Sequence, residues 1–211
     1  MTVLANPSIQ RAEFVEHWTH DDFMRLAPED KKAELIDGRI VIYPPVFDTH
    51  ARLYGFLLCI VGGFVDKFHL GRVIGCRYAV CIAEDQTYEP DLMFVQRDRT
   101  HLMTQAKMLE TPDLVIELVS SVNADYLRGS KRLNYEKAGL RELWLIDPYG
   151  PAGTQFFQRQ GDRLIEVAPV DGIFHSAALA GLKLQVRWLW PDQNDQLPNP
   201  IDVLKELKVK I

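Results

Sequence analysis

The stretch 112–120, PDLVIELVS, is apolar at most of its positions, which is typical of a strand buried on both faces of a sheet. The next segment, 123–139, has a helical pattern and ends at Gly139, a residue suited to a C-terminal cap. Segment 142–148 is a second buried strand, which stops at Pro148. This strand–helix–strand order predicts a right-handed crossover between parallel strands, so we expect an α/β fold.

The rest of the chain also divides into short helical and strand-like segments. Thr19, with Asp22 three positions later, is a weaker relative of a capping box and predicts the start of a helix. Asp37-Gly38, between apolar residues, is a strong signal for a hairpin turn. The predicted elements are a helix at 19–26, a hairpin at 33–45, a helix from 50 to about 68, strands at 72–83 and 88–97, and, after the crossover, a β-hairpin, a late strand within GLKLQVRWLW and a short final helix.

These elements predict a mixed central sheet with helices on both faces and additional β elements at the C-terminal end. With 211 residues, the chain has the size of one α/β domain with a sizeable core. We therefore expect a single domain over 1–211, with a core at about 30–150 and a β decoration and tail at about 151–211.

Charge and composition narrow the classes of function and location. The formal net charge of −5 does not indicate a strongly basic surface, so nucleic-acid binding would use a local patch or bridging metal ions. The cysteines Cys59, Cys76 and Cys81 form no CxxC pair, which favours neither a disulfide framework nor a zinc site. The first residues, MTVLANPSIQRAEF, lack the pattern of a signal peptide, and the apolar stretch 53–65 is too short for a membrane span of about 20 residues. A cytoplasmic protein without membrane association is expected.

Glu117 lies inside the apolar run DLVIELV, where an ionised side chain must be paired, hydrogen-bonded or metal-bound. One interpretation is a structural ion pair with a neighbouring Arg or Lys. The other rests on three further residues: Asp91 on an adjacent predicted strand, Lys131 on the following helix, and Glu34 at the start of the hairpin. Carboxylates suit Mg²⁺ or Mn²⁺, and such an ion polarises a phosphate while a lysine orients the attacking water. This set indicates metal-assisted phosphodiester hydrolysis.

The tripeptide Pro-Asp-Leu occurs at both 90–92 and 112–114, but strand geometry separates the two aspartates. Asp113 and Glu117 share one strand face and lie about 13 Å apart, which is too far for one shared ion. If their strands are neighbours, Asp91 lies beside Glu117, with Cα atoms about 5 Å apart. We therefore predict that Asp91 is a metal ligand and that Asp113 is the polar start of a buried strand.

Several segments together resemble a known nuclease family. They are ELIDGRIVIYPP, His50, EPDLMFV, PDLVIELVSS, KRLNYEKAGLRELWLIDP and GLKL, which cover roughly residues 20–190 in this order. The Pro-Asp at 90–91 and the Glu-Leu-Val at 117–119 resemble the PD-(D/E)XK signature, and the closer resemblance is to the Uma-type restriction endonuclease family. This resemblance implies a restriction-endonuclease-like α-β-β-β-α-β core.

The resemblance also implies roles for individual residues. Asp91 corresponds to the catalytic aspartate and Glu117 to the second metal ligand. Val119 stands where the signature has its lysine. The resemblance implies that this family moves the lysine to the following helix, where Lys131 stands at the matching place. Glu34 is similar to the acidic residue that some of these nucleases add from an early element.

Three other polar residues have both a functional and a structural interpretation. His50 matches a recurrent family position, but it is also compatible with a hydrogen-bonded residue at the start of a helix. Tyr135, four positions after Lys131 on the same helix face, is expected to pack or to orient its neighbours. Arg128 shares this face and would contact either phosphate or solvent.

Other enzyme classes have weaker support. Ser120-Ser121 lack a nucleophile elbow, and the motifs for dinucleotide or P-loop phosphate binding are missing from the sequence. The late aromatic residues are expected to form a hydrophobic face under the β decoration, with base stacking as the alternative. They are Phe156, Phe157, Phe174, Trp188 and Trp190.

The sequence thus predicts an Mg²⁺-dependent endonuclease acting on DNA, with Asp91 and Glu117 as metal ligands and Lys131, Glu34 and His50 in support. One alternative is a non-catalytic binding module in which the same acidic groups only form ion pairs. Another is a metal-dependent hydrolase of a different phosphate ester. Because cutting both strands of a duplex suits two-fold symmetry, a homodimer is expected.

Overall fold

The computed structural model of the chain describes residues 17–75, 77–120 and 123–209. Within these residues, six strands form a central sheet and five form a smaller one. In spatial order, the central sheet contains β11 (Arg163–Glu166), β10 (Gln155–Gln160), β9 (Glu142–Ile146), β8 (Leu114–Leu118), β6 (Leu92–Gln96) and β3 (Gly71–Gly75). The smaller sheet contains β2 (Arg39–Ile42), β1 (Ala33–Ile36), β5 (Gln86–Tyr88), β4 (Ala79–Ala83) and β7 (Lys107–Met108).

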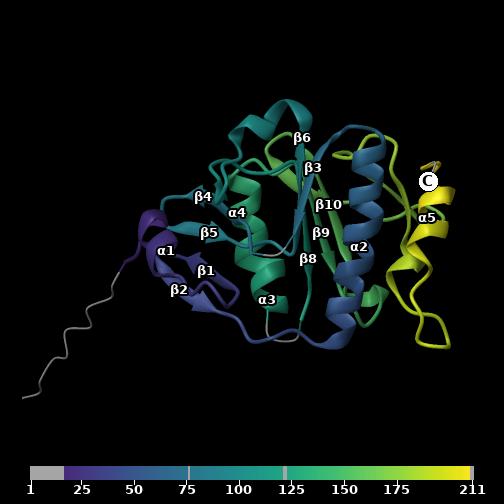
Figure 1. Ribbon diagram of the computed structural model, residues 1–211, viewed down its shortest axis with the longest axis horizontal. Coiled ribbons are helices and arrows are strands. Elements are labelled where there is room, and N and C mark those ends of the chain that lie inside the picture. Colours follow the sequence, from purple (N-terminus) through teal and green to yellow (C-terminus); the bar gives the residue numbers. More distant parts are fainter. Residues whose placement is uncertain (1–16, 76, 121–122, 210–211) are drawn as a thin grey trace, which may run out of the picture.

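Helices cover the central sheet on both faces, as the sequence predicts (Figure 1). The long helix α2 lies on one face, and the smaller sheet and the helices that follow β8 lie on the other. The helices are α1 (His20–Leu26), α2 (Asp48–Lys67), α3 (Ala124–Tyr126), α4 (Arg132–Lys137) and α5 (Pro200–Glu206). A further two-stranded hairpin pairs β12 (Ile173–His175) with β13 (Lys183–Gln185). The mixed α/β class with extra C-terminal strands is confirmed.

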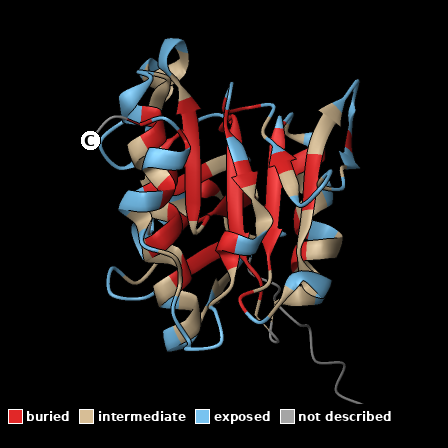
Figure 2. Cartoon of the chain, turned by 90° about the vertical axis from the view of Figure 1, so that its right-hand side faces the viewer, coloured by how far each residue is buried: buried red, intermediate tan, exposed pale blue. Residues whose placement is uncertain are grey.

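Alternate residues of the central strands face two separate hydrophobic clusters. Phe94 and Ile116 pack with α2 residues such as Phe64 in one cluster, whereas Val115 packs with Tyr135 in the other. Figure 2 shows the central strands as almost continuously buried, with exposed residues gathered on the outer helices and loops. Since both faces are covered, the charged side chains on the innermost strands, Glu117 on β8 and Glu142 on β9, are removed from water.

The predicted crossover is present, with one irregularity. β8 and β9 are parallel neighbours, with Glu117 opposite Leu145. The connecting helix is divided into α3, a π-helical turn at Leu127–Lys131 and α4, and it is kinked at Gly129. Gly139 adopts a φ of 87° just beyond the helix, a conformation that glycine adopts at little cost. The π-helical turn was not predicted.

The N-terminal predictions are also confirmed. Thr19 caps α1 and forms a reciprocal capping box with Asp22. β1 and β2 form the expected hairpin, in which Glu34 pairs with Val41. Its turn residues, Asp37 and Gly38, have φ angles of 48° and 71°, as a two-residue hairpin turn requires.

The prediction of a single strand at 72–83 is wrong. β3 belongs to the central sheet and β4 to the smaller one, and between them Arg77 adopts a φ of 58°, a left-handed conformation that ends an extended strand. The predicted strand 88–97 is similarly divided into β5 and β6 on either side of Pro90, which has no N–H to donate to a ladder.

The late aromatic residues pack into the hydrophobic core, as the sequence predicts, rather than standing free to stack on bases. Phe156 stacks on Phe174 with ring centroids 4.1 Å apart, and Trp144 meets both rings edge-on. Trp188 is also buried, in the same cluster as α2. The final helix, α5, joins this cluster through Val203.

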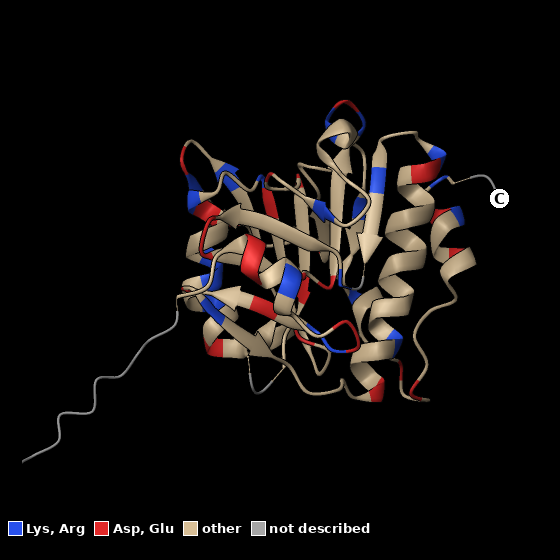
Figure 3. Ribbon diagram, turned by 60° about the vertical axis from the view of Figure 1, so that its left-hand side comes forward, with Lys and Arg blue, Asp and Glu red and all other residues tan. Residues whose placement is uncertain are grey.

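The charged side chains of α2 lie at its two ends, as Figure 3 shows. Its apolar middle faces the central sheet. Among the described residues, no helix combines the length and the apolar character needed to cross a membrane. The N-terminal stretch in which no signal peptide is predicted, residues 1–14, lies outside the described residues, as do Cys76 and Ser121.

Candidate functional site

Asp91 and Glu117 face each other across neighbouring strands. β6 and β8 are antiparallel, with Leu92 opposite Ile116, and the next position in this register sets Asp91 opposite Glu117. The backbone N–H of Leu118 donates a hydrogen bond of 2.8 Å to Asp91 Oδ2. The strand pairing therefore brings together the two carboxylates that the sequence singles out.

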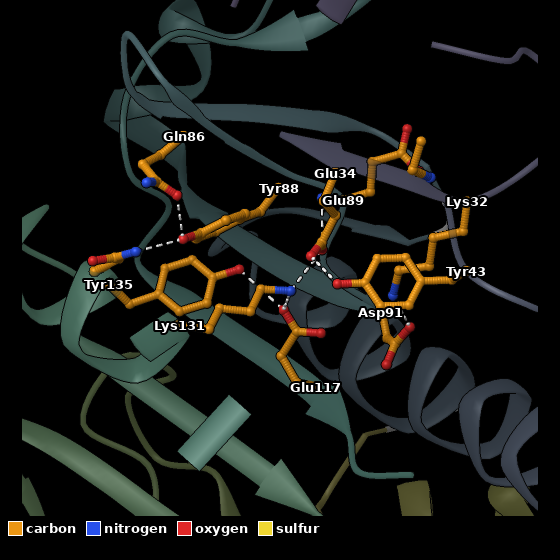
Figure 4. Close-up of polar contacts among 12 residues, drawn as sticks. Lys32, Glu34, Tyr43, Gln86, Tyr88, Glu89, Asp91, Glu117, Lys131 and Tyr135 are labelled. Atoms are coloured by element: carbon orange, nitrogen blue, oxygen red, sulfur yellow. Dashed lines mark hydrogen bonds and ion pairs between the residues drawn. The ribbon is translucent and has the colours of Figure 1, made fainter. Parts of the chain in front are cut away.

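Lys131 is held between two carboxylates. Its Nζ lies 2.8 Å from Glu117 Oε1 and 2.6 Å from Glu34 Oε1, and it lies over the rings of Tyr88 and Tyr135 (Figure 4). The side chain is only 2% exposed. The helix that follows β8 thus returns its lysine to the strand, although Val119 is buried in the core and supplies no charge there.

Hydrogen bonds hold both partners of this lysine in place. The Tyr135 hydroxyl donates to Glu117 Oε1 at 3.0 Å, so this tyrosine has the orienting contact that the sequence allows. Glu34 accepts from the Tyr43 hydroxyl at 2.9 Å and from the Glu89 backbone N–H at 3.2 Å. Glu34 is fully buried on β1, so the smaller sheet contributes a carboxylate to the group of charged side chains around Lys131, which is called the cluster below.

Lys32 is a member of the cluster that was not predicted. Its Nζ lies 2.8 Å from Asp91 Oδ1, and the charged group also lies near the ring of Tyr43. Lys32 stands two positions before Glu34, and residues at this spacing in a strand face the same side. That spacing is the signal in the sequence that could have identified it.

His50 lies near the start of α2, with Nε2 3.8 Å from Asp91 Oδ1. Burial, together with the nearby charge of Lys32, lowers the pKa of His50, although Asp91 acts in the opposite direction. The imidazole is therefore held mainly in its neutral form. The structure places this predicted residue at the edge of the cluster, beside Asp91.

The cluster carries more negative than positive charge. Three carboxylates, those of Glu34, Asp91 and Glu117, surround the two ammonium groups of Lys32 and Lys131, which leaves one negative charge if all are ionised. Burial opposes ionisation of Asp91, but the charge of Lys32 and the hydrogen bonds from Lys32 and from the Leu118 backbone N–H outweigh it and hold the pKa of Asp91 below its usual value. For Glu117, which shares Lys131 with Glu34, burial prevails and raises the pKa.

A cleft of about 510 Å³ opens beside Asp91. Asp91, His50 and Lys32 line it, whereas Glu34, Glu117 and Lys131 are buried and do not line it. Asp91 is thus the carboxylate of this cluster that lines the cleft. A ligand in the cleft reaches this carboxylate first.

The donor set at the cleft suits a hard divalent cation. Mg²⁺ is commonly held by one or two carboxylates and completes its shell with water, and the excess negative charge favours a further cation. Within the described ranges, no cluster of three or more His, Cys, Asp or Glu residues is arranged to hold a metal ion. Asp91, which lines the cleft, and Glu117, which lies opposite it in the strand register, are the candidate ligands.

Asp113 and Arg128 have structural partners elsewhere. Asp113 accepts a hydrogen bond from the Gln96 backbone N–H and pairs with Arg99 at 3.1 Å and Arg141 at 3.2 Å. It lies at the end of β8 away from Glu117, which agrees with its interpretation as the polar start of a strand. Arg128 donates to the Gly153 carbonyl at 2.7 Å.

Comparisons with known proteins agree with this architecture. The model of the Uma2 family, described as "Putative restriction endonuclease", matches residues 20–187. A solved structure from Anabaena variabilis, described as a putative nuclease belonging to DUF820, superposes with a TM-score of 0.67 at 20% identity. The superposition covers 81% of this chain and 96% of that one, so the two share a fold. No match was found among curated proteins.

Proposed function

We propose that this chain, which belongs to the Uma2 family, is a metal-dependent endonuclease that hydrolyses the phosphodiester bonds of DNA. The observation that carries the proposal is the meeting of Asp91, Glu117 and Lys131. Glu117 lies on β8 and Asp91 lies just before the neighbouring strand β6, and the lysine lies 2.8 Å from Glu117. A buried arrangement of this kind, next to an open cleft, is typical of a catalytic site.

In this proposal, Asp91 and Glu117 hold Mg²⁺ or Mn²⁺. The bound ion would supply Lewis-acid stabilisation of the negative charge that develops on the phosphate. Hydrolysis forms a bond between the water oxygen and phosphorus, breaks one ester P–O bond, and transfers a proton to the leaving oxygen. Lys131 would orient the attacking water and offset the developing charge.

Glu34 and His50 would support these groups from either side. Glu34 holds Lys131 at 2.6 Å and so fixes the position of its ammonium group relative to Glu117. His50 lies at the wall of the cleft beside Asp91, where it can donate or accept a hydrogen bond to the substrate or its water. Both residues would act chiefly by positioning.

A nicking assay tests the assignment. The wild-type protein should cut supercoiled and single-stranded circular DNA when Mg²⁺ or Mn²⁺ is present and not when EDTA is present. Asp91→Asn and Glu117→Gln should each abolish cutting, while Asp113→Asn, at the other end of β8, should retain it. Metal-dependent activity that survives either of the first two substitutions would sink the assignment. Competition by free nucleotides that stops DNA cutting would point instead to a different phosphate ester.

One observation favours a second candidate, a non-catalytic binding module. Both carboxylates already have ammonium partners, Lys32 for Asp91 and Lys131 for Glu117, so the cluster is stable as a set of ion pairs. Calorimetric titration with Mn²⁺ separates the two candidates. The endonuclease should bind the ion and lose this binding in Asp91→Asn, whereas a pure scaffold should bind none.

We also propose that the enzyme acts as a homodimer, because two sites related by two-fold symmetry can reach both strands of a duplex. Sedimentation velocity at micromolar concentration measures the assembly directly. A single species with the mass of one chain, with and without DNA, would contradict this part of the proposal.

A further inference from the structure

Two aromatic side chains stand largely in water beside the cleft at Asp91. Phe47, immediately before α2, is 74% exposed, and Tyr149, shortly after β9, is 70% exposed. Both line the cleft. Single exposed apolar residues are common on protein surfaces, but here two large rings from distant segments meet at the same cleft as the proposed catalytic aspartate.

The core does not account for these rings. The hydrophobic clusters formed by the described residues include neither Phe47 nor Tyr149. The aromatic residues nearby in sequence behave differently: Trp144, for example, is fully buried against Phe156. Exposed apolar groups gathered at one place mark a binding site, and Val46, which is also exposed, extends the same lining.

The cleft is lined by both apolar and charged side chains, and a nucleotide likewise combines an apolar base face with a charged phosphate. Its aromatic and proline-rich lining suits the face of a base, because base–aromatic stacking is sequence-tolerant. Its polar part contains Lys31 and Lys32, whose ammonium groups suit a phosphate. Asp91 lies in the same cleft, where the metal of the proposed function would face that phosphate. The lining therefore offers aromatic faces for a base and ammonium groups for a phosphate.

The size of the cleft limits how much nucleic acid can enter. The cleft has a volume of about 510 Å³, which lies within the range of small-molecule sites. A base that stacks on a protein ring must expose its face, and a base inside a paired and stacked duplex does not. A single nucleotide with an unpaired base has the right scale, because ligand clefts of this volume enclose small molecules.

We infer that this cleft is a subsite for one unpaired nucleotide next to the bond that is cut, with its base stacked on Phe47 and Tyr149. The inference rests on the proposed endonuclease function and names its substrate class. The substrate is DNA with an unpaired nucleotide at the cleavage position, either in a single strand or displaced from a duplex. Phe47 and Tyr149 recognise the base, and Lys31 and Lys32 recognise the adjoining phosphate.

Binding can be measured without cutting, with the wild-type chain in EDTA. The probe is a short oligonucleotide that contains 2-aminopurine, a base analogue whose fluorescence falls when it stacks. A single strand should bind at least about tenfold more tightly than its blunt duplex, with quenching of the probe. A duplex in which the probe lies in an unpaired flap should behave like the single strand.

Two variants and two controls identify the rings responsible. The double variant Phe47→Ala, Tyr149→Ala should weaken single-strand binding by about five- to a hundredfold and remove the quenching. The single variant Phe47→Trp keeps two aromatic rings at the cleft and should therefore retain both binding and quenching. Phe68→Ala is a matched control, because Phe68 is a partly exposed aromatic residue just beyond the far end of α2, about 30 Å away along the helix. Thermal unfolding of each variant confirms that it is folded.

Three outcomes would overturn the inference: equal binding of the blunt duplex and the single strand, quenching that persists in the double alanine variant, or a change only in self-association when the rings are removed. The third outcome would identify the rings as an interface between copies of this chain. Failure here is distinct from failure of the proposed function, because cutting is assayed separately. Cutting without stacking contradicts only this inference, and stacking without cutting contradicts only the endonuclease.

Discussion

Lys131 places its ammonium group 2.8 Å from a carboxylate oxygen of Glu117, across the connection between β8 and the helix that follows it. Position 119, two residues after Glu117, holds a valine that packs in the core. Valine carries no charge, so position 119 does not supply the ammonium group that pairs with Glu117. The same ion pair is reached from the helix instead, because the kinked helix packs back over the strand that precedes it.

Replacing Lys131 by methionine is expected to destabilise the protein strongly. Glu34 and Glu117 would then lose their shared cation while they remain buried, and breaking a buried pair costs about 3–5 kcal/mol. Urea unfolding monitored by circular dichroism gives the free energy of unfolding. Lys137→Met, at the exposed end of the same helix, is the control and should change stability little. A loss below about 1 kcal/mol for Lys131→Met would contradict the expectation.

The sequence predicts the carboxylates better than it predicts their partners. A charged residue within an apolar run must be paired, hydrogen-bonded or metal-bound, so Glu117 is identifiable from DLVIELV alone. Strand geometry then favours Asp91 over Asp113 as its neighbour. Lys32 was not predicted because it precedes β1 by one position, so that only its spacing of two from Glu34 indicates which side it faces. The ends of 72–83 belong to different sheets, and alternation along a strand contains no information about which sheet it joins.

The connecting helix shows a similar limit. Apolar spacing in the segment before Lys131 identifies a helix and the face that packs on the sheet, but it does not distinguish a π-helical turn from an α-helical one over so few residues. Yet this turn and the kink at Gly129 affect where the Lys131 ammonium lies. Contacts of this kind depend on the packing of the whole chain.

Asp113→Asn should reduce stability without reducing nuclease activity per folded molecule. Asp113 is buried and pairs with Arg99 and Arg141, so the substitution weakens charge-assisted hydrogen bonds worth about 1–3 kcal/mol. Differential scanning fluorimetry and the nicking assay measure the two effects. Asp98→Asn, on a neighbouring exposed turn, is the control for stability. A complete loss of cutting in a folded Asp113→Asn protein would show that the second Pro-Asp-Leu also contributes to catalysis.

Lys32→Met should tighten the binding of Mn²⁺. The Lys32 ammonium lies 2.8 Å from Asp91 Oδ1, and a metal ion at that oxygen must displace this charge. Removing a nearby positive charge in a partly buried site is expected to lower the dissociation constant by at least about tenfold. Isothermal titration calorimetry measures the constant. Lys31→Met, at an exposed lysine of the same cleft, should have a smaller effect, and unchanged binding in Lys32→Met would show that the two cations do not compete.

His20 should make folding stability depend on pH below neutrality. The side chain is buried beside Thr87 and Lys107, with Nδ1 2.7 Å from Thr87 Oγ1 and Nε2 2.9 Å from Lys107 Nζ. An ammonium group can only donate, so Nε2 accepts and Nδ1 carries the proton. Burial and the charge of Lys107 lower the pKa of His20 below its usual value of 6.5, against the smaller opposite effect of Asp21.

The folded state therefore binds a proton on His20 less readily than the unfolded state, so this contribution to stability is complete above the unfolded pKa and is lost as the pH falls through the folded one. Each pKa unit of lowering corresponds to about 1.4 kcal/mol. Between about pH 7.5 and about pH 5.5, the wild-type melting temperature should fall more than that of His20→Gln. His175→Gln, at an exposed histidine, should melt with the wild-type pH dependence. An equal fall for the wild type and His20→Gln would mean that His20 does not carry this dependence.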